Sequence, residues 1–124
     1  MRVLIVENNP DLGVVWKQHL ERQGAEVQLE YCEDNAVKYL TENSADVIVL
    51  NLDLDCGRAL PIADFAAYRH PAARVIFVTA SSFFSDGSIF SHAANACACL
   101  PVRTPPEDLA ALVEFHGRGA NAAE

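Results

Sequence analysis

The chain has 124 residues, which fits one domain of ordinary size, and 51% of them are hydrophobic, which excludes a disordered protein. Its formal net charge of -8 excludes a typical nucleic-acid surface, because such a surface needs a basic stripe to neutralise phosphates. The four cysteines form no C-x-x-C pair, and no apolar stretch is long enough for a secretory signal or a membrane span, so we expect a cytoplasmic protein without membrane association.

Five short apolar or alternating segments predict β-strands. Residues 3–6, 47–51 and 74–79 are apolar almost throughout, which is typical of strands that are covered on both faces of a sheet. Residues 26–31 alternate between polar and apolar side chains, which indicates a half-exposed edge strand. Residues 96–100 are small and apolar and predict a narrow fifth strand.

Five helices are predicted between and after these strands. Asn9 followed by Pro10 is a helix start signal, and Gly24 is a stop signal. The other four helical segments are residues 34–43, 58–69, about 86–94 and 105–116, the last of them starting with a capping box at 104–107. Gly117 is expected to end the last helix, which leaves residues 118–124 as a loose tail after a domain over residues 1–117.

Strands that alternate with helices in one small domain imply an α/β fold with a doubly wound parallel sheet. The flavodoxin-like order 2-1-3-4-5 places the alternating strand 26–31 at an edge and the apolar strands inside. Sites in such folds lie at the carboxyl ends of the strands. Here those ends are Glu7 and Asn8, Asn51, Thr79, and residues 100–103.

Four segments carry a resemblance to a known family. They are the strand and acidic turn over 3–10, the buried strand over 46–50, the strand over 75–80, and the dipeptide 100–101. In order and spacing they resemble the receiver domain of response regulators in two-component signalling, a CheY-like, flavodoxin-like fold. The resemblance covers residues 3 to about 116 and implies a signal-transduction module of the phosphorelay type.

The residues that would carry the family's chemistry match poorly. The phosphate-accepting aspartate of the family falls at Asn51, whose amide nitrogen is not a nucleophile. The two adjacent acidic residues that hold magnesium in the family fall at Glu7 and Asn8, so one carboxylate is missing there too. Because Mg²⁺ prefers anionic oxygen ligands, we expect at most weak magnesium binding, by Glu7 with Asp53, and no other cofactor.

Further positions depart from the family in the same direction. Its phosphate-binding lysine falls at Val102, with Arg103 as a possible substitute, and its aromatic switch residue falls at Cys99. Thr79 alone keeps its family identity. Cys97 and Cys99 are expected on one face of their strand, where core packing is favoured over a metal or redox pair.

The interpretation that follows is a pseudo-receiver, a phosphorylation-independent module that acts by protein–protein binding and is not an enzyme. Its partner would be a histidine kinase or an output protein, and a homodimer stays open. The expected contact surface is built from the fourth and fifth helices and the fifth strand, with Phe84, Phe90 and Cys99 on it.

Two alternatives stay open. Asp53, two residues past Asn51, would be the phosphoacceptor of a working receiver that takes phosphate from a histidine kinase. A flavodoxin-like ligand-binding domain is the second alternative, although residues 7–10 stand where a glycine-rich phosphate loop would be expected. Asn51 itself is expected to hydrogen-bond neighbouring loops rather than to ligate directly.

Overall fold

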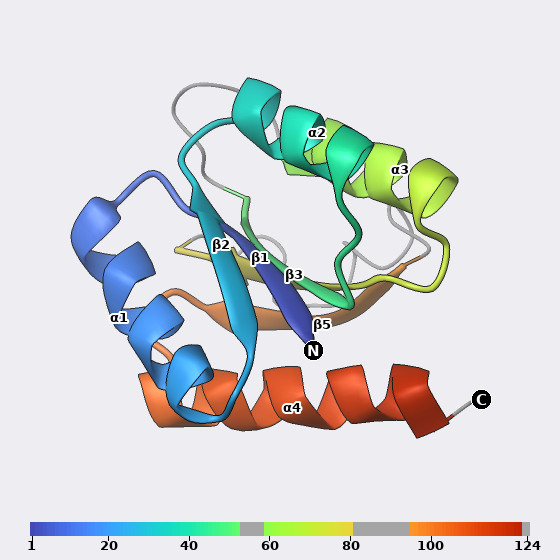
Figure 1. Cartoon of the computed structure of the whole chain (residues 1–124). Coiled ribbons are helices and arrows are strands. Elements are labelled where there is room, and N and C mark those ends of the chain that lie inside the picture. The colour runs from blue at the N-terminus through green and yellow to red at the C-terminus, as the bar shows by residue number, and fades with distance from the viewer. Residues whose placement is uncertain (53–58, 81–94, 123–124) are drawn as a thin grey trace.

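A computed structural model of the chain describes residues 1–52, 59–80 and 95–122, with side chains up to residue 117. It contains a five-stranded parallel sheet in the order β2-β1-β3-β4-β5 with helices on both faces (Figure 1), which confirms the predicted fold class. The strands are β1 (Arg2–Val6), β2 (Glu26–Glu30), β3 (Val47–Asn51), β4 (Arg74–Thr79) and β5 (Ala96–Pro101). The described helices are α1 (Pro10–Arg22), α2 (Glu33–Glu42), α3 (Ala59–Arg69) and α4 (Pro106–Ala122). The helix predicted at 86–94 lies outside the described residues.

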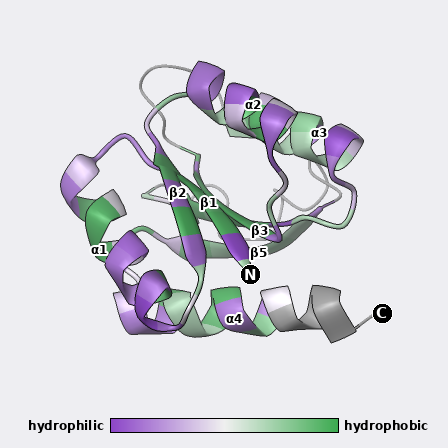
Figure 2. Cartoon of the chain, viewed as in Figure 1, coloured by the Kyte–Doolittle hydropathy of each residue, from purple (hydrophilic) through white to green (hydrophobic). Residues whose placement is uncertain are grey.

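Each face of the sheet is covered by one pair of helices. Helices α2 and α3 lie over one face, and α1 and α4 lie over the other (Figure 1). Successive strand residues point to opposite faces, so Leu4 and Ile48 pack under α2 and α3 while Val3 and Val47 pack against α1 and α4. The central strands are accordingly apolar along most of their length (Figure 2), and polar groups lie at the strand ends and on the edge strand β2.

The start and stop signals of α1 act as predicted. The Asn9 side-chain oxygen accepts hydrogen bonds from the backbone N–H groups of Asp11 and Leu12 at 3.1 and 3.3 Å. The helix ends at Arg22, and Gly24 follows with a φ of +91°, a left-handed conformation that suits glycine. None of the described helices is long and apolar enough to cross a membrane.

The predicted end of the C-terminal helix is wrong. Helix α4 continues through Gly117 to Ala122, where the sequence suggested a stop. Gly117 is buried against the side chain of Met1, and a Cβ atom there would clash with the methionine sulfur. The glycine therefore serves a close approach between the two ends of the chain rather than a helix stop. The division into a domain over 1–117 and a tail stays a prediction.

The prediction that Cys97 and Cys99 share one strand face is also wrong. The register of β5 against β4 shifts between Val75 and Ile76, so that Cys97 is the extra residue of a β-bulge. The apolar cluster between the sheet and helices α1 and α4, which contains Val3 and Val47, is called the α1–α4 cluster, and that under α2 and α3, which contains Leu4 and Ile48, is called the α2–α3 cluster. Cys97 therefore packs against the α1–α4 cluster, while Cys99 packs against the α2–α3 cluster. A bulge changes the phase of the alternation by one residue, which the sequence pattern alone does not reveal.

The environment of Cys97 makes its thiol a poor nucleophile. Burial raises the pKa of Cys97 to about 11, and the Arg74 guanidinium only partly opposes this effect. Because the thiolate is the reactive species, we expect Cys97 to react with iodoacetamide near neutral pH about 100-fold more slowly in the folded chain than in denaturant. Peptide mapping by mass spectrometry measures both rates on the same cysteine, and equal rates would contradict the packing described for β5.

Candidate functional site

Three polar side chains are buried where the central strands end. Glu7 directly follows β1, Asn51 is the last residue of β3, and Thr79 is the last residue of β4. Their exposed fractions are 1%, 5% and 5%, and within the described part of the chain no other polar or charged side chain is fully buried. The structure therefore concentrates its buried polarity at the edge of the sheet where the topology predicts a site.

The side chains of Glu7 and Asn51 are bonded directly to each other. The Asn51 side-chain nitrogen Nδ2 donates to Glu7 Oε2 at 2.6 Å, and the contact is buried. An ionised carboxylate can only accept hydrogen bonds, so the amide has to present its nitrogen to Glu7. A buried carboxylate needs hydrogen-bond donors in place of the water molecules it loses on burial, and the Asn51 amide supplies one of them.

The second oxygen of Glu7 has a partner as well. Glu7 Oε1 accepts a hydrogen bond from the backbone N–H of Asn9 at 3.0 Å, at the residue that caps α1. The carboxylate consequently lies beside the amino end of this helix, where the helix dipole favours negative charge. Both oxygens of Glu7 are occupied by neutral donors that the chain itself supplies.

Backbone hydrogen bonds tie the remaining strand ends to this pair. The backbone N–H of Leu52 donates to the Val78 carbonyl at 2.9 Å, and that of Val102 donates to the Thr79 carbonyl at 2.9 Å. The Val102 side chain is half-buried and packs against the α1–α4 cluster. The resemblance to receiver domains predicts a lysine at position 102, but the valine there contributes to the packing of the core.

The other predicted site residues are placed less closely. Asn8 is half-buried in the turn after β1 and has interactions of its own, and Arg103 is exposed after β5. Cys99 is half-buried on the α2–α3 side of the sheet. Asp53 lies outside the described residues, so its part in the site stays a prediction.

The described residues do not fit the magnesium site that receiver domains would imply. Among them, no three histidine, cysteine, aspartate or glutamate side chains gather closely enough to hold a metal ion. Glu7 is the one carboxylate placed at the carboxyl ends of β1, β3 and β4 in the described ranges, and both its oxygens already accept hydrogen bonds. Mg²⁺ prefers anionic oxygens and gives up water reluctantly, so a neutral amide at position 51 is a poor substitute for a carboxylate. Weak binding by Glu7 and Asp53 stays a prediction.

Solved structures with the same arrangement are numerous. A CheY-like receiver domain protein from Methanospirillum hungatei aligns with a TM-score of 0.89 at 21% identity, over 99% of this chain and 98% of that one. The chain has the receiver-domain fold. The N-terminal domain of a response regulator/sensory box/GGDEF protein from Carboxydothermus hydrogenoformans aligns with a TM-score of 0.85 at 19% identity, over 99% of this chain and 98% of that one.

A third solved structure with this receiver fold is that of a complex. It is the response regulator TrrA from Thermotoga maritima in complex with Mg²⁺ and BeF, with a TM-score of 0.79 at 19% identity, over 93% of this chain and 97% of that one. The sequence matches no protein-family model and has no significant match among curated proteins. The likeness is thus one of fold, carried by backbone geometry rather than by sequence.

Sequence reasoning located the strand-end residues but did not identify which of them bond to each other. Asn51 was expected to bond neighbouring loops, and its side chain donates to the carboxylate of Glu7 in the loop that follows β1. The signal was available in the topology, because parallel neighbours β1 and β3 bring residues at their carboxyl ends together. The hydrogen bond from the Asn9 N–H to the Glu7 side chain could be predicted from nothing in the sequence other than the shortness of the turn between β1 and α1.

Replacing Asn51 by aspartate tests the pair. Asn51→Asp removes the donor and places a second carboxylate beside Glu7, so we expect a loss of about 2–4 kcal/mol in the free energy of unfolding. Asn51→Ala is the matched control, because it removes the donor without adding charge and should lose less unfolding free energy.

Mg²⁺ should then restore stability to the aspartate variant alone, by neutralising the two carboxylates. Chemical denaturation with EDTA or with Mg²⁺ measures this, and an unchanged stability of Asn51→Asp in EDTA would contradict the assignment.

Proposed function

We propose that this chain is a phosphorylation-independent receiver module that acts by binding another protein. The observation that carries the proposal is the buried bond from the Asn51 amide to the Glu7 carboxylate. It occupies, with a neutral group, the position at which a receiver would present its phosphate-accepting carboxylate. In this proposal the chain has the fold of a signalling domain, but the side chain at the centre of its site forms a hydrogen bond within the protein.

Three features of the chain agree with this proposal. An amide cannot form an acyl phosphate, because its nitrogen is not nucleophilic. Val102 offers no cation to a phosphoryl oxygen, since its side chain packs against the core. Thr79 is already buried at the end of β4.

Phosphorylation in a receiver shifts a two-state equilibrium by adding contacts in one state. Without that input, binding is constitutive or is set by the concentration of the partner.

A phosphoryl donor distinguishes this proposal from a working receiver. We expect no mass increase of the intact chain after incubation with acetyl phosphate and Mg²⁺, because position 51 lacks a nucleophile. A known working receiver, treated in parallel, serves as the positive control for the donor. A phosphoryl adduct that disappears in Asp53→Asn would replace the proposal by the alternative in which Asp53 is the acceptor.

The outer side of α4 is the proposed contact surface within the described residues. Phe115 is 69% exposed there, and its ring meets that of His116 edge to face at a centroid distance of 5.2 Å. Large exposed aromatic side chains are enriched at protein interfaces. Phe84 and Phe90, which were expected on the same surface, lie outside the described residues. The proposed partners are a histidine kinase, an output protein or a second copy of the chain.

Position 115 can be compared directly with position 68. Tyr68 is also an exposed aromatic residue, at 85%, but it lies on α3, on the opposite side of the sheet. We expect a photo-crosslinking amino acid at position 115 to capture one defined protein in cells of the source organism, and the same group at position 68 to capture none. Phe115→Glu should abolish the association and leave circular dichroism unchanged. Equal capture from the two positions would contradict the proposed surface.

A further inference from the structure

The outer edge of β2 presents unpaired backbone groups at two positions. The Glu26 N–H donates to the Met1 carbonyl at 2.9 Å, and the Glu30 carbonyl accepts from the Glu7 N–H at 3.1 Å. Backbone groups alternate in direction along a strand, so those of Glu26, Gln28 and Glu30 face β1. The N–H and C=O groups of Val27 and Leu29 consequently point away from the sheet, and no described strand lies on that side.

The two faces of this edge differ in chemistry. The side chains of Val27 and Leu29 are half-buried and pack against the α1–α4 cluster. Glu26, Gln28 and Glu30 point to the opposite face, where Gln28 Nε2 donates to Glu30 Oε2 at 2.7 Å. No residue of β2 joins the apolar cluster under α2 and α3, so this face of the strand is polar and uncovered by the core.

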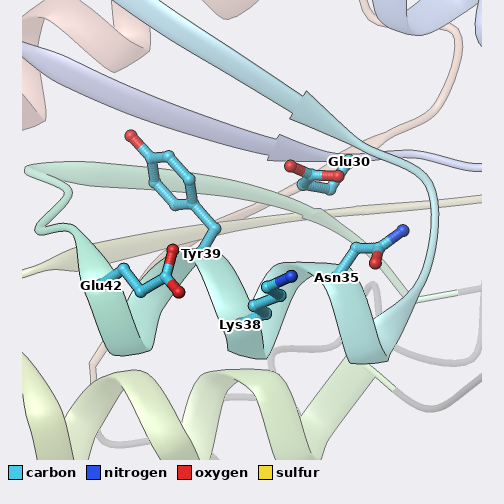
Figure 3. Close-up of a pocket in the computed structure, with 5 residues that line it drawn as sticks. All are labelled: Glu30, Asn35, Lys38, Tyr39 and Glu42. Carbon is cyan, nitrogen blue, oxygen red and sulfur yellow. The ribbon is translucent and has the colours of Figure 1, made fainter.

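A groove of about 310 Å³ lies between the carboxyl end of β2 and helix α2, on the polar side of this edge. Glu30 lines it from β2, and four residues line it from α2 (Figure 3), namely Asn35, Lys38, Tyr39 and Glu42. Two carboxylates against one ammonium leave the groove with a net negative charge. It lies beside the open edge of β2 and does not include Glu7 or Asn51.

We propose that this edge accepts an extended segment of another protein that alternates basic and apolar residues. The segment would add a sixth strand by pairing with the backbone groups of Val27 and Leu29. Its basic side chains would then point into the groove toward Glu30 and Glu42, and its apolar side chains would extend the surface formed by Val27 and Leu29. This site is separate from the α4 surface and does not depend on the function proposed above.

A second copy of the chain is disfavoured as the occupant. In an antiparallel pairing that uses Val27 and Leu29 of both copies, Gln28 lies on the two-fold axis and Glu26 of one copy lies opposite Glu30 of the other. Like charges directly opposite each other destabilise a strand pair. The carboxylates of Glu30 and Glu42 therefore favour a basic strand, while Glu26 opposite Glu30 disfavours self-pairing.

Synthetic peptides test the site on the whole chain. A short peptide that alternates lysine and valine should bind, and the amide resonances of Val27 and Leu29 should shift most in nuclear magnetic resonance titrations. A peptide of the same composition, with its lysines in one block and its valines in another, should bind about tenfold or more weakly, because it cannot match both faces at once. An alternating glutamate–valine peptide should not bind.

Three protein variants separate the effect of charge from that of backbone pairing. The double variant Glu30→Lys with Glu42→Lys should weaken binding of the lysine–valine peptide at least tenfold. The double variant Glu107→Lys with Asp108→Lys makes the same charge change on α4 and should have little effect. Val27→Pro removes an outward N–H that β1 does not use, so the sheet should tolerate it while peptide affinity falls about tenfold.

A modified peptide covers the case in which Val27→Pro does not fold. Methylating the peptide nitrogens that face β2 removes the same hydrogen bonds and leaves the protein unchanged, and it should weaken binding to a similar degree. The proposal is overturned if the alternating peptide fails to bind, if the block peptide binds equally well, or if the shifted resonances lie elsewhere than β2 and α2. Equal affinity of the methylated peptide would also overturn it.

Discussion

The hydrogen bond between Asn51 and Glu7 connects the ends of β1 and β3, and the carboxyl edge of the sheet is arranged around it. A buried carboxylate needs donors, and the two that Glu7 receives come from the strand beside it and from the turn that starts α1. Removing the Asn51 donor leaves Glu7 Oε2 buried without this hydrogen bond. The polarity at this edge is thus a structural requirement of the fold.

The two surfaces proposed for partner binding both lie on the outside of the molecule. The central strands are apolar on both faces and covered by helices, so they offer nothing to a partner. The chemical groups that are accessible on helix α4 differ from those that are accessible on strand β2. Helix α4 presents a single large aromatic ring, Phe115, whereas β2 presents backbone groups beside carboxylates. The two proposed surfaces would select their partners in different ways, one through an aromatic side chain and the other through backbone hydrogen bonds, and therefore would not compete.

The sequence predicted most of the fold because its local patterns and its topology agree. All-apolar runs marked the inner strands, alternation marked the edge, and Asn9 marked the first helix. Each wrong prediction depends on a contact between residues far apart in the sequence or on a shift in the alternation of side chains along a strand. The role of Gly117 depends on Met1, and the orientation of Cys97 depends on a bulge against β4. At the site, residue types could be assigned to strand ends, but the choice of Glu7 as the partner of Asn51 required the side-chain geometry.

The bulge in β5 determines which bonds its two cysteines can form. Cys97 and Cys99 are only two residues apart, yet the sheet separates their side chains, one on each face. A disulfide requires Cβ atoms about 4 Å apart that point toward each other, which the folded strand does not allow. With an added two-electron oxidant that takes up the electrons and protons of the two thiols, this pair could form a disulfide only after β5 had detached from β4. A Cys97–Cys99 disulfide formed in this way would therefore report the opening of one edge of the sheet.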